Sequence, residues 1–186
     1  IAFTGCSNDC AKVRMADFGI IGMTEPQYDP NRCVACEQCI KYCKKRSVDA
    51  LSLVNGKIVR DTKKCIGCGV CITYCPTRAW TRSKEHYFRL VILGRTGKRN
   101  PRLAEDFIKW CDEESILKIA ANTYAYIEEY IDPEAVENKE HIGYIVDRTG
   151  FEKFKEYIFR DVSLSEKAEV AQEVYWGGKH YDRYGG

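Results

Sequence analysis

The arrangement of cysteine constrains this chain more than any other feature. Eleven of its 186 residues are cysteine, and eight of them form two runs with the spacing C-x2-C-x2-C-x3-C. Each cysteine of the first run lies 32 positions before its counterpart, as Cys33 does before Cys65, so the runs form an internal repeat. Disulfide-rich proteins are usually short and secreted, and no secretory signal is visible here, so the spacing favours metal ligation.

Spacing of this kind is typical of bacterial ferredoxins that hold two [4Fe–4S] clusters. In that pattern the last cysteine of each run binds the cluster of the other run. The ligands predicted for cluster 1 are Cys33, Cys36, Cys39 and Cys75. Those predicted for cluster 2 are Cys65, Cys68, Cys71 and Cys43. Because such clusters need a reducing compartment with little oxygen, we expect a cytoplasmic protein.

A short hairpin is predicted between the runs, because Asn55-Gly56 separates two short segments of alternating apolar residues. We therefore expect a compact two-cluster module at residues 28–84. One departure from the ferredoxin pattern is Lys44, which follows Cys43 where a proline often stands. Its side chain is either solvated or a positive charge that slightly raises the potential of cluster 2.

The charge and hydropathy of the chain exclude two classes of protein. Its 29 Lys and Arg nearly balance its 27 Asp and Glu, and a net charge of +2 lacks the basic excess that nucleic-acid or membrane-surface binding requires. No apolar run approaches the roughly 20 residues of a membrane-spanning helix, so we expect no membrane span. Three His residues leave little room for histidine-based metal chemistry.

The sequence after the module carries strand and helix signals. A strand is predicted over Tyr87–Leu93, followed by a glycine-rich basic loop at residues 94–99. Asn100 and Pro101 have the residue types of a helix start, and the spacing of the apolar residues after them predicts a helix over Pro101–Cys111. Three more helices are predicted at residues 113–130, 142–147 and 151–159, and Asp112 is expected to cap the first of them.

A further cysteine motif precedes the module. Cys6 and Cys10 form a C-x3-C pair within G-C-S-N-D-C, and D-F-G-I-I-G follows at residues 17–22. This combination resembles the second cysteine motif of siroheme-containing sulfite and nitrite reductases. The resemblance extends to M-T-E-P-Q-Y at 23–28, C-P-T-R-A-W at 75–80, G-R-T-G-K-R-N-P-R-L at 94–103 and I-V-D-R-T-G-F at 145–151. Over nearly its whole length the chain is similar to the C-subunit family of anaerobic sulfite reductases.

The resemblance implies a fold of the α+β class. It would be a partial siroheme-reductase-type domain with an inserted bacterial-ferredoxin-like 2[4Fe–4S] module. The expected segments are residues 1–27 and 85–160 for the siroheme/[4Fe–4S] domain, 28–84 for the insertion and 161–186 for a C-terminal docking tail.

The resemblance also implies siroheme and a third [4Fe–4S] cluster. In the family, C-x3-C supplies two ligands of this cluster and an upstream C-x5-C motif supplies the other two, so Cys6 and Cys10 would be half of the set. By the same resemblance Cys10 would bridge the cluster to the siroheme iron, and Asn8 would contact the cofactor. Siroheme carries carboxylates and needs a basic cradle, unless the basic loop is only a solvated face. The candidates for this cradle are Arg95, Lys98, Arg99 and Arg102.

The implied activity is the six-electron reduction of sulfite to sulfide, with the ferredoxin clusters passing electrons to the siroheme-coupled cluster. The implied partners are sulfite, electron-donating flavin and iron–sulfur subunits, and an N-terminal half of the same subunit that would precede Ile1 and carry most of the catalytic site. No catalytic residue is assigned within this chain. Two alternatives stay open: an electron-transfer subunit without catalysis of its own, and a siroheme nitrite reductase.

Several conspicuous residues are explained better by packing than by chemistry. Cys111 is expected to be a small buried apolar side chain, and Trp80 is expected to shield a cluster from water. The tyrosines at 124, 126 and 130 have helical spacing and are expected to pack. No role is assigned to His86, His141 or His180.

Overall fold

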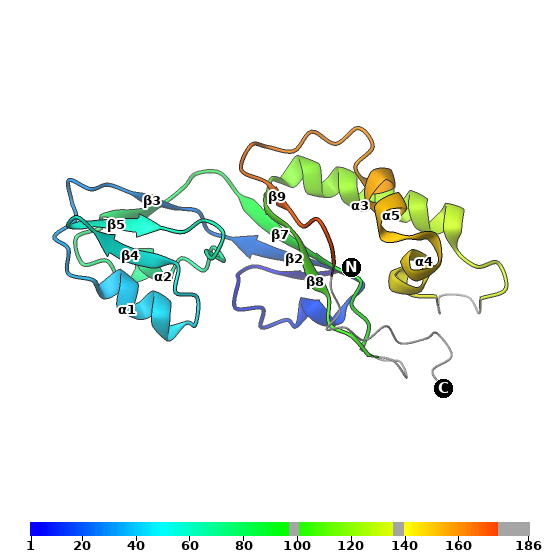
Figure 1. The fold of residues 1–186 in the computed structure, drawn as a ribbon, viewed down its shortest axis with the longest axis horizontal. Coiled ribbons are helices and arrows are strands. Elements are labelled where there is room, and N and C mark those ends of the chain that lie inside the picture. The colour runs from blue at the N-terminus through cyan, green and yellow to red at the C-terminus, as the bar shows by residue number, and fades with distance from the viewer. Residues whose placement is uncertain (97–100, 136–139, 175–186) are drawn as a thin grey trace. The chain divides into compact units, whose positions relative to one another are not determined.

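The computed structural model describes residues 1–96, 101–135 and 140–174. The chain divides into two compact units (Figure 1). The first unit contains residues 1–5, 9–21 and the described residues from Tyr87 onward. The second unit contains residues 6–8 and 22–86, and the segment predicted as the two-cluster module falls within it.

A five-stranded sheet forms the first unit, in the order β1-β2-β7-β8-β9. The strands are β1 Ala2–Thr4, β2 Phe18–Met23, β7 Tyr87–Ile92, β8 Glu105–Cys111 and β9 Glu169–Val170. β1 pairs with β2 in parallel, whereas β7–β8 and β8–β9 are antiparallel. The strand predicted after the module is confirmed as β7, which neighbours β2 although more than sixty residues separate them in sequence.

The helix predicted over Pro101–Cys111 is wrong, because this segment contains β8. The pairing of β8 with β7 slips twice, between Phe88 and Leu90 and between Leu90 and Val91 of β7. Each slip inserts an extra residue into β8 and breaks the alternation of buried and exposed side chains. The buried positions therefore fall in pairs, 107–108 and 110–111, which imitate the spacing of a helical face. Asn100, the predicted cap, lies outside the described residues.

Three helices cover one face of this sheet (Figure 1). They are α3 Glu113–Tyr130, α4 Ile142–Thr149 and α5 Phe151–Ile158, and all three were predicted to within a few residues. The Asp112 side chain accepts a hydrogen bond from the Ser115 N–H at 2.8 Å, which satisfies a free donor at the start of α3. Cys111 is fully buried in this core, as expected, and so is Tyr126, whereas Tyr124 is exposed.

The opposite face of the sheet has a smaller core. The short 3-10 helix η1, Val13–Met15, places Val13 against Ile21 and Val91. Adjacent residues of one strand therefore serve different cores, since Leu90 and Ile92 point to the helices and Val91 points to η1. Residues 162–174 also contribute apolar side chains to the larger core, and β9 within them pairs with β8. The C-terminal aromatic residues from 175 onward lie outside the described residues.

The second unit is built from two β-ribbons and two short helices. β3 Pro26–Tyr28 pairs with β6 Trp80–Arg82, and the predicted hairpin is confirmed as β4 Leu51–Val54 and β5 Lys57–Arg60. Asn55 and Gly56 at its turn both have positive φ, as a two-residue hairpin turn requires. The helices are α1 Gln38–Lys45 and α2 Val70–Thr73. In the described parts of both units, no helix is long and apolar enough to cross a membrane.

Candidate iron–sulfur sites

Four cysteines from both runs line one small cavity in the second unit. They are Cys33, Cys36, Cys39 and Cys75, the set predicted for cluster 1. The cavity is closed by apolar atoms of Ile58, Ala79 and Trp80. Cys39 interacts electrostatically with Cys33 and with Cys75. The last thiol of the second run thus lies among the first three thiols of the first run.

The remaining four cysteines of the runs form a second group. Cys43 interacts electrostatically with Cys65 and Cys68, and Cys71 interacts with the same two residues. This is the set predicted for cluster 2. In the described ranges no three His, Cys, Asp or Glu side chains are arranged to hold a single metal ion. A [4Fe–4S] cluster asks for a different geometry, because its four thiolates bind separate irons.

Left-handed backbone turns place the cysteines at the start of each helix. Ala35 and Glu37 have φ of 52° and 56°, and Gly67 and Gly69, 32 positions later, have φ of 64° and 70°. These residues reverse the chain between successive cysteines, so that three thiols of one run can face one point. The second run uses glycine for both reversals, whereas the first run forces two residues with a Cβ into the same conformation.

Backbone N–H groups point at three of the thiols. Ala35 N–H donates to Cys33 Sγ at 3.4 Å, Ala50 N–H to Cys43 Sγ at 3.3 Å and Ala79 N–H to Cys75 Sγ at 3.2 Å. The Thr77 hydroxyl lies 3.7 Å from Cys75 Sγ as well. Hydrogen bonds of this kind orient the ligands of a metal cluster and stabilise negative charge on sulfur.

Burial and hydrogen bonding act in opposite directions on the thiols. Burial raises the pKa of Cys39 and of Cys43, and raises the pKa of Cys71 to about 12. Burial also acts on Cys75, but hydrogen bonds from the Trp80 and Ala79 backbone and from the Thr77 side chain outweigh it and lower the pKa of this thiol. Without iron, most of these buried thiols are neutral near pH 7, so cluster binding would release protons.

The C-x3-C pair is exposed at both cysteines. Between them, the Ser7 hydroxyl donates to the Ile66 carbonyl and Asn8 Oδ1 accepts a hydrogen bond from Arg46 Nη1 at 2.7 Å. Asn8, predicted to contact the cofactor, is thus tied to the end of α1. Cys6 belongs to the second unit and Cys10 to the first.

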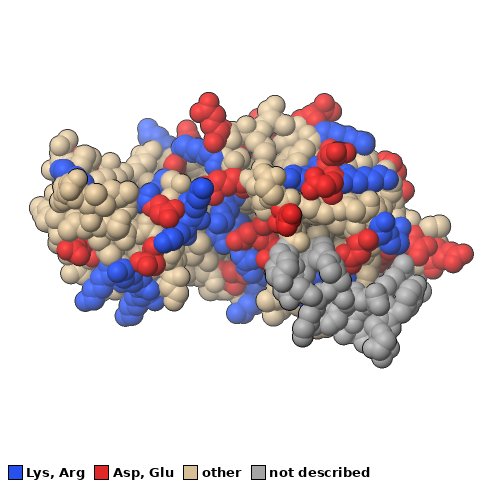
Figure 2. All heavy atoms as spheres, in the orientation of Figure 1, with Lys and Arg blue, Asp and Glu red and all other residues tan. Residues whose placement is uncertain are grey.

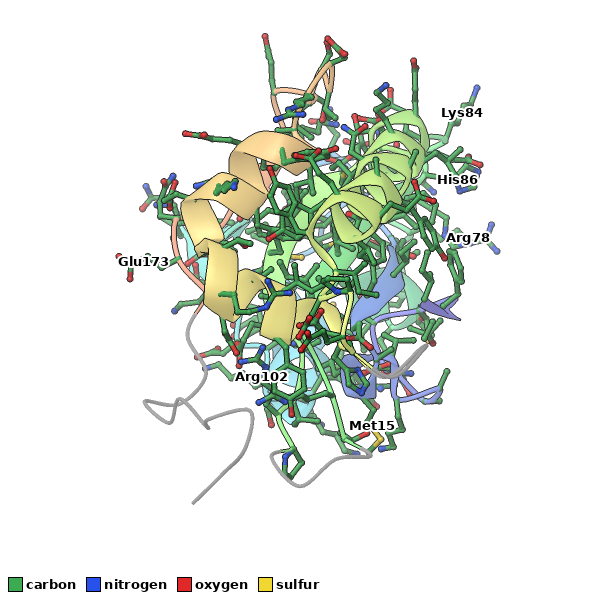
Figure 3. The ribbon with its side chains drawn as sticks, turned by 90° about the vertical axis from the view of Figure 1, so that its right-hand side faces the viewer. Met15, Arg78, Lys84, His86, Arg102 and Glu173 are labelled. Atoms are coloured by element: carbon green, nitrogen blue, oxygen red, sulfur yellow. The ribbon has the colours of Figure 1, made fainter. Side chains whose placement is uncertain are left out.

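Two of the four basic residues predicted for the cradle are buried in the first unit. Arg95 and Arg102 pair through their backbones, with N···O distances of 2.8 and 2.7 Å, and both guanidinium groups face Asp147 of α4. Arg95 also stacks on the Tyr144 ring at 3.9 Å, and Arg102, labelled in Figure 3, donates from Nε to the Leu93 carbonyl at 2.9 Å. Burial lowers the pKa of Arg102, and Asp147 opposes that shift. Lys98 and Arg99 lie outside the described residues.

A family match covers most of the chain. Residues 1–167 match the family described as "Nitrite and sulphite reductase 4Fe-4S domain". The chain belongs to this family. Members of the nitrite and sulphite reductase family are iron–sulfur oxidoreductases, which agrees with the thiol groups of the second unit.

Curated relatives narrow the relationship within the nitrite and sulphite reductase family. The chain is 41% identical over 172 residues to the C-subunit of the anaerobic sulfite reductase of Salmonella typhimurium, which covers 92% of this chain and 50% of the relative. It is 35% identical over 49 residues to "Coenzyme F420-dependent sulfite reductase" of Methanocaldococcus jannaschii, covering 26% of this chain and 8% of that protein. The chain therefore spans about half the length of the first relative.

A solved structure has a similar fold. The crystal structure of dissimilatory sulfite reductase I aligns with a TM-score of 0.58 and 18% sequence identity, over 98% of this chain and 46% of that one. At this identity the likeness is one of fold. It supports the mixed α/β architecture of a sulfite reductase, which the sequence predicted in its coarse form.

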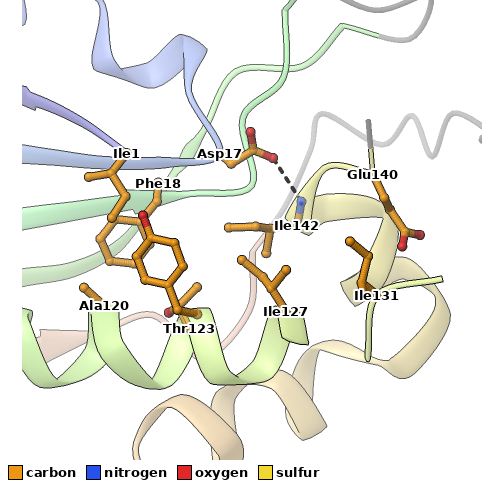
Figure 4. A pocket seen from close by; sticks show the side chains of 10 residues that line it. Ile1, Asp17, Phe18, Ala120, Thr123, Ile127, Ile131, Glu140 and Ile142 are labelled. Carbon is orange, nitrogen blue, oxygen red and sulfur yellow. Dashed lines mark hydrogen bonds between the residues drawn. The ribbon is translucent and has the colours of Figure 1, made fainter. Parts of the chain in front are cut away.

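The D-F-G segment that carried part of the family resemblance has a structural role in this member. The Asp17 carboxylate lies 2.8 Å from His141 Nδ1 and accepts from the Ile142 N–H at 3.0 Å, so it caps α4 from outside the helix (Figure 4). Gly19 is pressed so closely between Val13 and Val91 that a Cβ would meet the Val13 carbonyl at 2.7 Å. The cavity of about 250 Å³ beside Asp17 is lined by four residues of α3 and by apolar side chains that include Phe18 and Ile142, and no cysteine lines it.

Sequence reasoning missed one residue of the cluster 1 site. Tyr28 lies directly before Asp29, at the start of the predicted module, and its ring packs on Trp80 with centroids 4.7 Å apart. Its only sequence signal is its position, since the β3–β6 pairing that brings it beside Trp80 joins residues more than fifty positions apart.

Proposed function

We propose that this chain is part of a sulfite reductase subunit, and that it relays electrons through two [4Fe–4S] clusters toward a siroheme-coupled cluster where sulfite is reduced to sulfide. The observation that carries the proposal is the cavity lined by thiols of both cysteine runs. Crossed pairing of this kind is what two ferredoxin-type clusters require. The family and the curated relatives support the oxidoreductase class and sulfite as the substrate.

The two thiol groups are the proposed ligand sets. Cluster 1 would be held by Cys33, Cys36, Cys39 and Cys75, and cluster 2 by Cys65, Cys68, Cys71 and Cys43. The buried indole N–H of Trp80 beside the first set supports the fit, because it has no acceptor among the described residues and its side chain lines the cavity where a cluster would supply one. The clusters would supply one-electron transfer. The protein groups around them fix the thiols, exclude water and donate hydrogen bonds to sulfur.

Cys6 and Cys10 are the proposed contribution of this chain to the siroheme-coupled cluster, with Cys10 as the bridge to the siroheme iron. Both thiols are exposed, so they can meet ligands from another part of the protein. The other two ligands and most of the catalytic residues would lie in the part of the relatives that this chain does not span. Siroheme would supply the site of sulfite reduction. Arg95, Lys98, Arg99 and Arg102 would offset the negative charge of its carboxylates.

The proposed partners are electron-donating flavin and iron–sulfur subunits. Figure 2 shows Lys and Arg gathered over α1, and Lys41, Lys44 and Lys45 there are all exposed. Within residues 22–86, twelve Lys and Arg stand against six Asp and Glu, so the second unit is basic although the whole chain is nearly neutral. A basic surface of this kind steers acidic partners. The reducing conditions that such clusters need make the cytoplasm the proposed compartment.

The test is anaerobic purification of the full-length subunit with its partners. We expect about thirteen irons per subunit, twelve in clusters and one in siroheme, together with a Soret band. Cys10→Ser should remove the magnetic coupling between siroheme and its cluster, whereas the control Cys111→Ala, at a buried core position, should leave it unchanged. Turnover of sulfite by reduced methyl viologen completes the test. A full-length subunit without iron would refute the proposal.

The same anaerobic preparation of the full-length subunit also tests two alternative functions. A subunit with about eight irons and no Soret band would be an electron-transfer protein without catalysis of its own. A subunit that turns over nitrite and leaves sulfite unchanged would be a siroheme nitrite reductase. Because Arg95 and Arg102 are buried against Asp147, Lys98→Gln with Arg99→Gln is the sharper test of the basic cradle, and unchanged siroheme content would remove these two residues from it.

A further inference from the structure

Two aromatic side chains pack together beside cluster 1. Trp80 begins β6, five residues after Cys75, and the antiparallel register of β3 and β6 places it opposite Tyr28. Their ring centroids are 4.7 Å apart with 33° between the planes. This contact belongs to the apolar core of the second unit, which also contains Cys39.

The indole N–H of Trp80 is buried beside the cavity of the cluster 1 thiols. Trp80 is only 3% exposed, and in the described parts of the chain its Nε1 atom has no hydrogen-bond partner that meets ordinary distance and angle limits. The side chain lines the cavity of the four cluster 1 thiols, which is also where its polar atom can find an acceptor. Cys39 is the candidate acceptor in that cavity, because burial raises the pKa of its thiol and the neighbouring Trp80 side chain opposes the shift.

Tyr28 is a second potential hydrogen-bond donor to the cluster 1 thiols. Its hydroxyl oxygen accepts a hydrogen bond from the Ile58 N–H at 3.2 Å, so its own proton is free to be donated elsewhere. Tyr28 and Cys33 pack against the same apolar core of the second unit, so Cys33 is the candidate acceptor. Burial first, then hydrogen bonding with Cys33, raises the pKa of Tyr28. Two side chains of one ribbon, each with a proton to donate, therefore lie beside the thiols of cluster 1.

The repeat lacks this arrangement at cluster 2. Thirty-two positions before Trp80 stands Val48, and thirty-two after Tyr28 stands Arg60. Cys71, the counterpart of Cys39, is equally buried, and the side chain of Val48 has no N–H or O–H group to donate. The two proposed clusters would therefore have similar burial and different hydrogen bonding.

We propose that Trp80 and Tyr28 form a hydrogen-bonding cap that raises the reduction potential of cluster 1 above that of cluster 2. The proposal rests on the proposed function, because it requires both clusters to be present. Hydrogen bonds to the sulfurs of a cluster stabilise the additional negative charge of its reduced form. The cap would thus make cluster 1 the electron acceptor within the pair, and cluster 2 the entry point for electrons from an external one-electron donor.

The test is a potentiometric titration followed by EPR, on the full chain purified anaerobically with its iron. Trp80→Phe retains an aromatic ring and removes the N–H donor. We expect the one-electron reduction equilibrium of cluster 1 to weaken by up to about tenfold, which is about 59 mV, because the hydrogen bond is stronger to the more negative reduced cluster than to the oxidised one. Tyr28→Phe should shift the same cluster in the same direction, and neither variant should move cluster 2. Cys75→Ser identifies which signal belongs to cluster 1.

Trp110→Phe is the matched control, because Trp110 is also buried but lies in the first unit. An equal shift of both clusters in Trp80→Phe, or no shift with full iron content, would overturn the proposal while leaving the proposed function intact. A wild-type chain without iron would instead refute the proposed function. If Trp80→Phe loses iron, hyperfine spectroscopy of the wild type with tryptophan labelled by ¹⁵N at the indole nitrogen decides. Coupling of an indole ¹⁵N to cluster 1 supports the cap, and its absence contradicts it.

Discussion

The two halves of the cysteine repeat share a backbone and differ in the side chains around their thiols. α1 and α2 begin at Gln38 and Val70, 32 positions apart, and each follows a residue in the left-handed conformation. Around the thiols the likeness ends, because Trp80 stands in one half where Val48 stands in the other. The comparison shows that the cysteine spacing sets where the thiols lie, whereas residues outside the spacing set how each group is buried and hydrogen-bonded.

The halves also differ in the length of their helices. α1 runs through Lys44 to Lys45, but α2 ends at Thr73, before the last cysteine of its run. This difference explains the departure from the ferredoxin pattern. A proline fits at position 76, beyond the end of α2, while position 44 lies inside a helix, where proline would remove a hydrogen bond and clash with the preceding turn.

Exchange of the last cysteine in each run has the largest expected effect. Cys75→Ser and Cys43→Ser should each lower the iron content by about four atoms per chain, because each removes one thiolate from one cluster. The two variants should lose different EPR signals, since their thiols belong to different groups. Cys111→Ala should keep all module iron. Loss of the same signal in both variants would show that the crossed pairing is wrong.

Truncation of Trp80 has the second largest expected effect, and it should distinguish the two halves of the repeat by their unfolding free energy. Trp80→Ala removes a buried ring and should cost about 3–5 kcal/mol of unfolding free energy. Val48→Ala, at the equivalent and only partly buried position, should cost about 1 kcal/mol. Anaerobic denaturant titrations of the cluster-loaded chain measure both. Similar losses in the two variants would mean that the halves are packed alike.

The sequence predicted local features well and tertiary ones poorly. The turn at Asn55-Gly56 and the cap at Asp112 depend on a few adjacent residues, and both were predicted correctly. β8 was mistaken for a helix because two bulges in its ladder with β7 bring its buried residues into adjacent positions. This pattern depends on the partner strand, which a short stretch of sequence does not include. The role of Tyr28 could not be foreseen for a similar reason, because its partner Trp80 reaches it only through the β3–β6 pairing.

Exchange of lysine and proline after the last cysteine of each run tests the difference in length between α1 and α2. Lys44→Pro should cost about 3 kcal/mol, because position 44 lies within the hydrogen-bonded part of α1. Pro76→Lys, the reverse exchange, should cost only about 0.5–1 kcal/mol, mainly through the added freedom of the unfolded chain. Thermal unfolding under anaerobic conditions compares the pair. A mild effect of Lys44→Pro would show that α1 ends before this residue.

The smallest expected effect concerns the left-handed residues before the helices. Glu37 has φ of 56° and is exposed, whereas its counterpart Gly69 has φ of 70°. Glu37→Gly should stabilise the chain by about 0.5–1 kcal/mol, because relief of the left-handed strain exceeds the entropy that glycine adds to the unfolded state. Gly69→Ala should destabilise the chain by about 1 kcal/mol, because alanine is strained in the left-handed conformation. A clash adds nothing to this cost, since the new Cβ would meet Thr24 at an ordinary distance of 3.4 Å. Opposite signs in the two unfolding midpoints are the expected result. If both exchanges destabilise, Glu37 makes an interaction in the folded state that outweighs its strain, and the two halves of the repeat are less alike at this turn than their φ angles indicate.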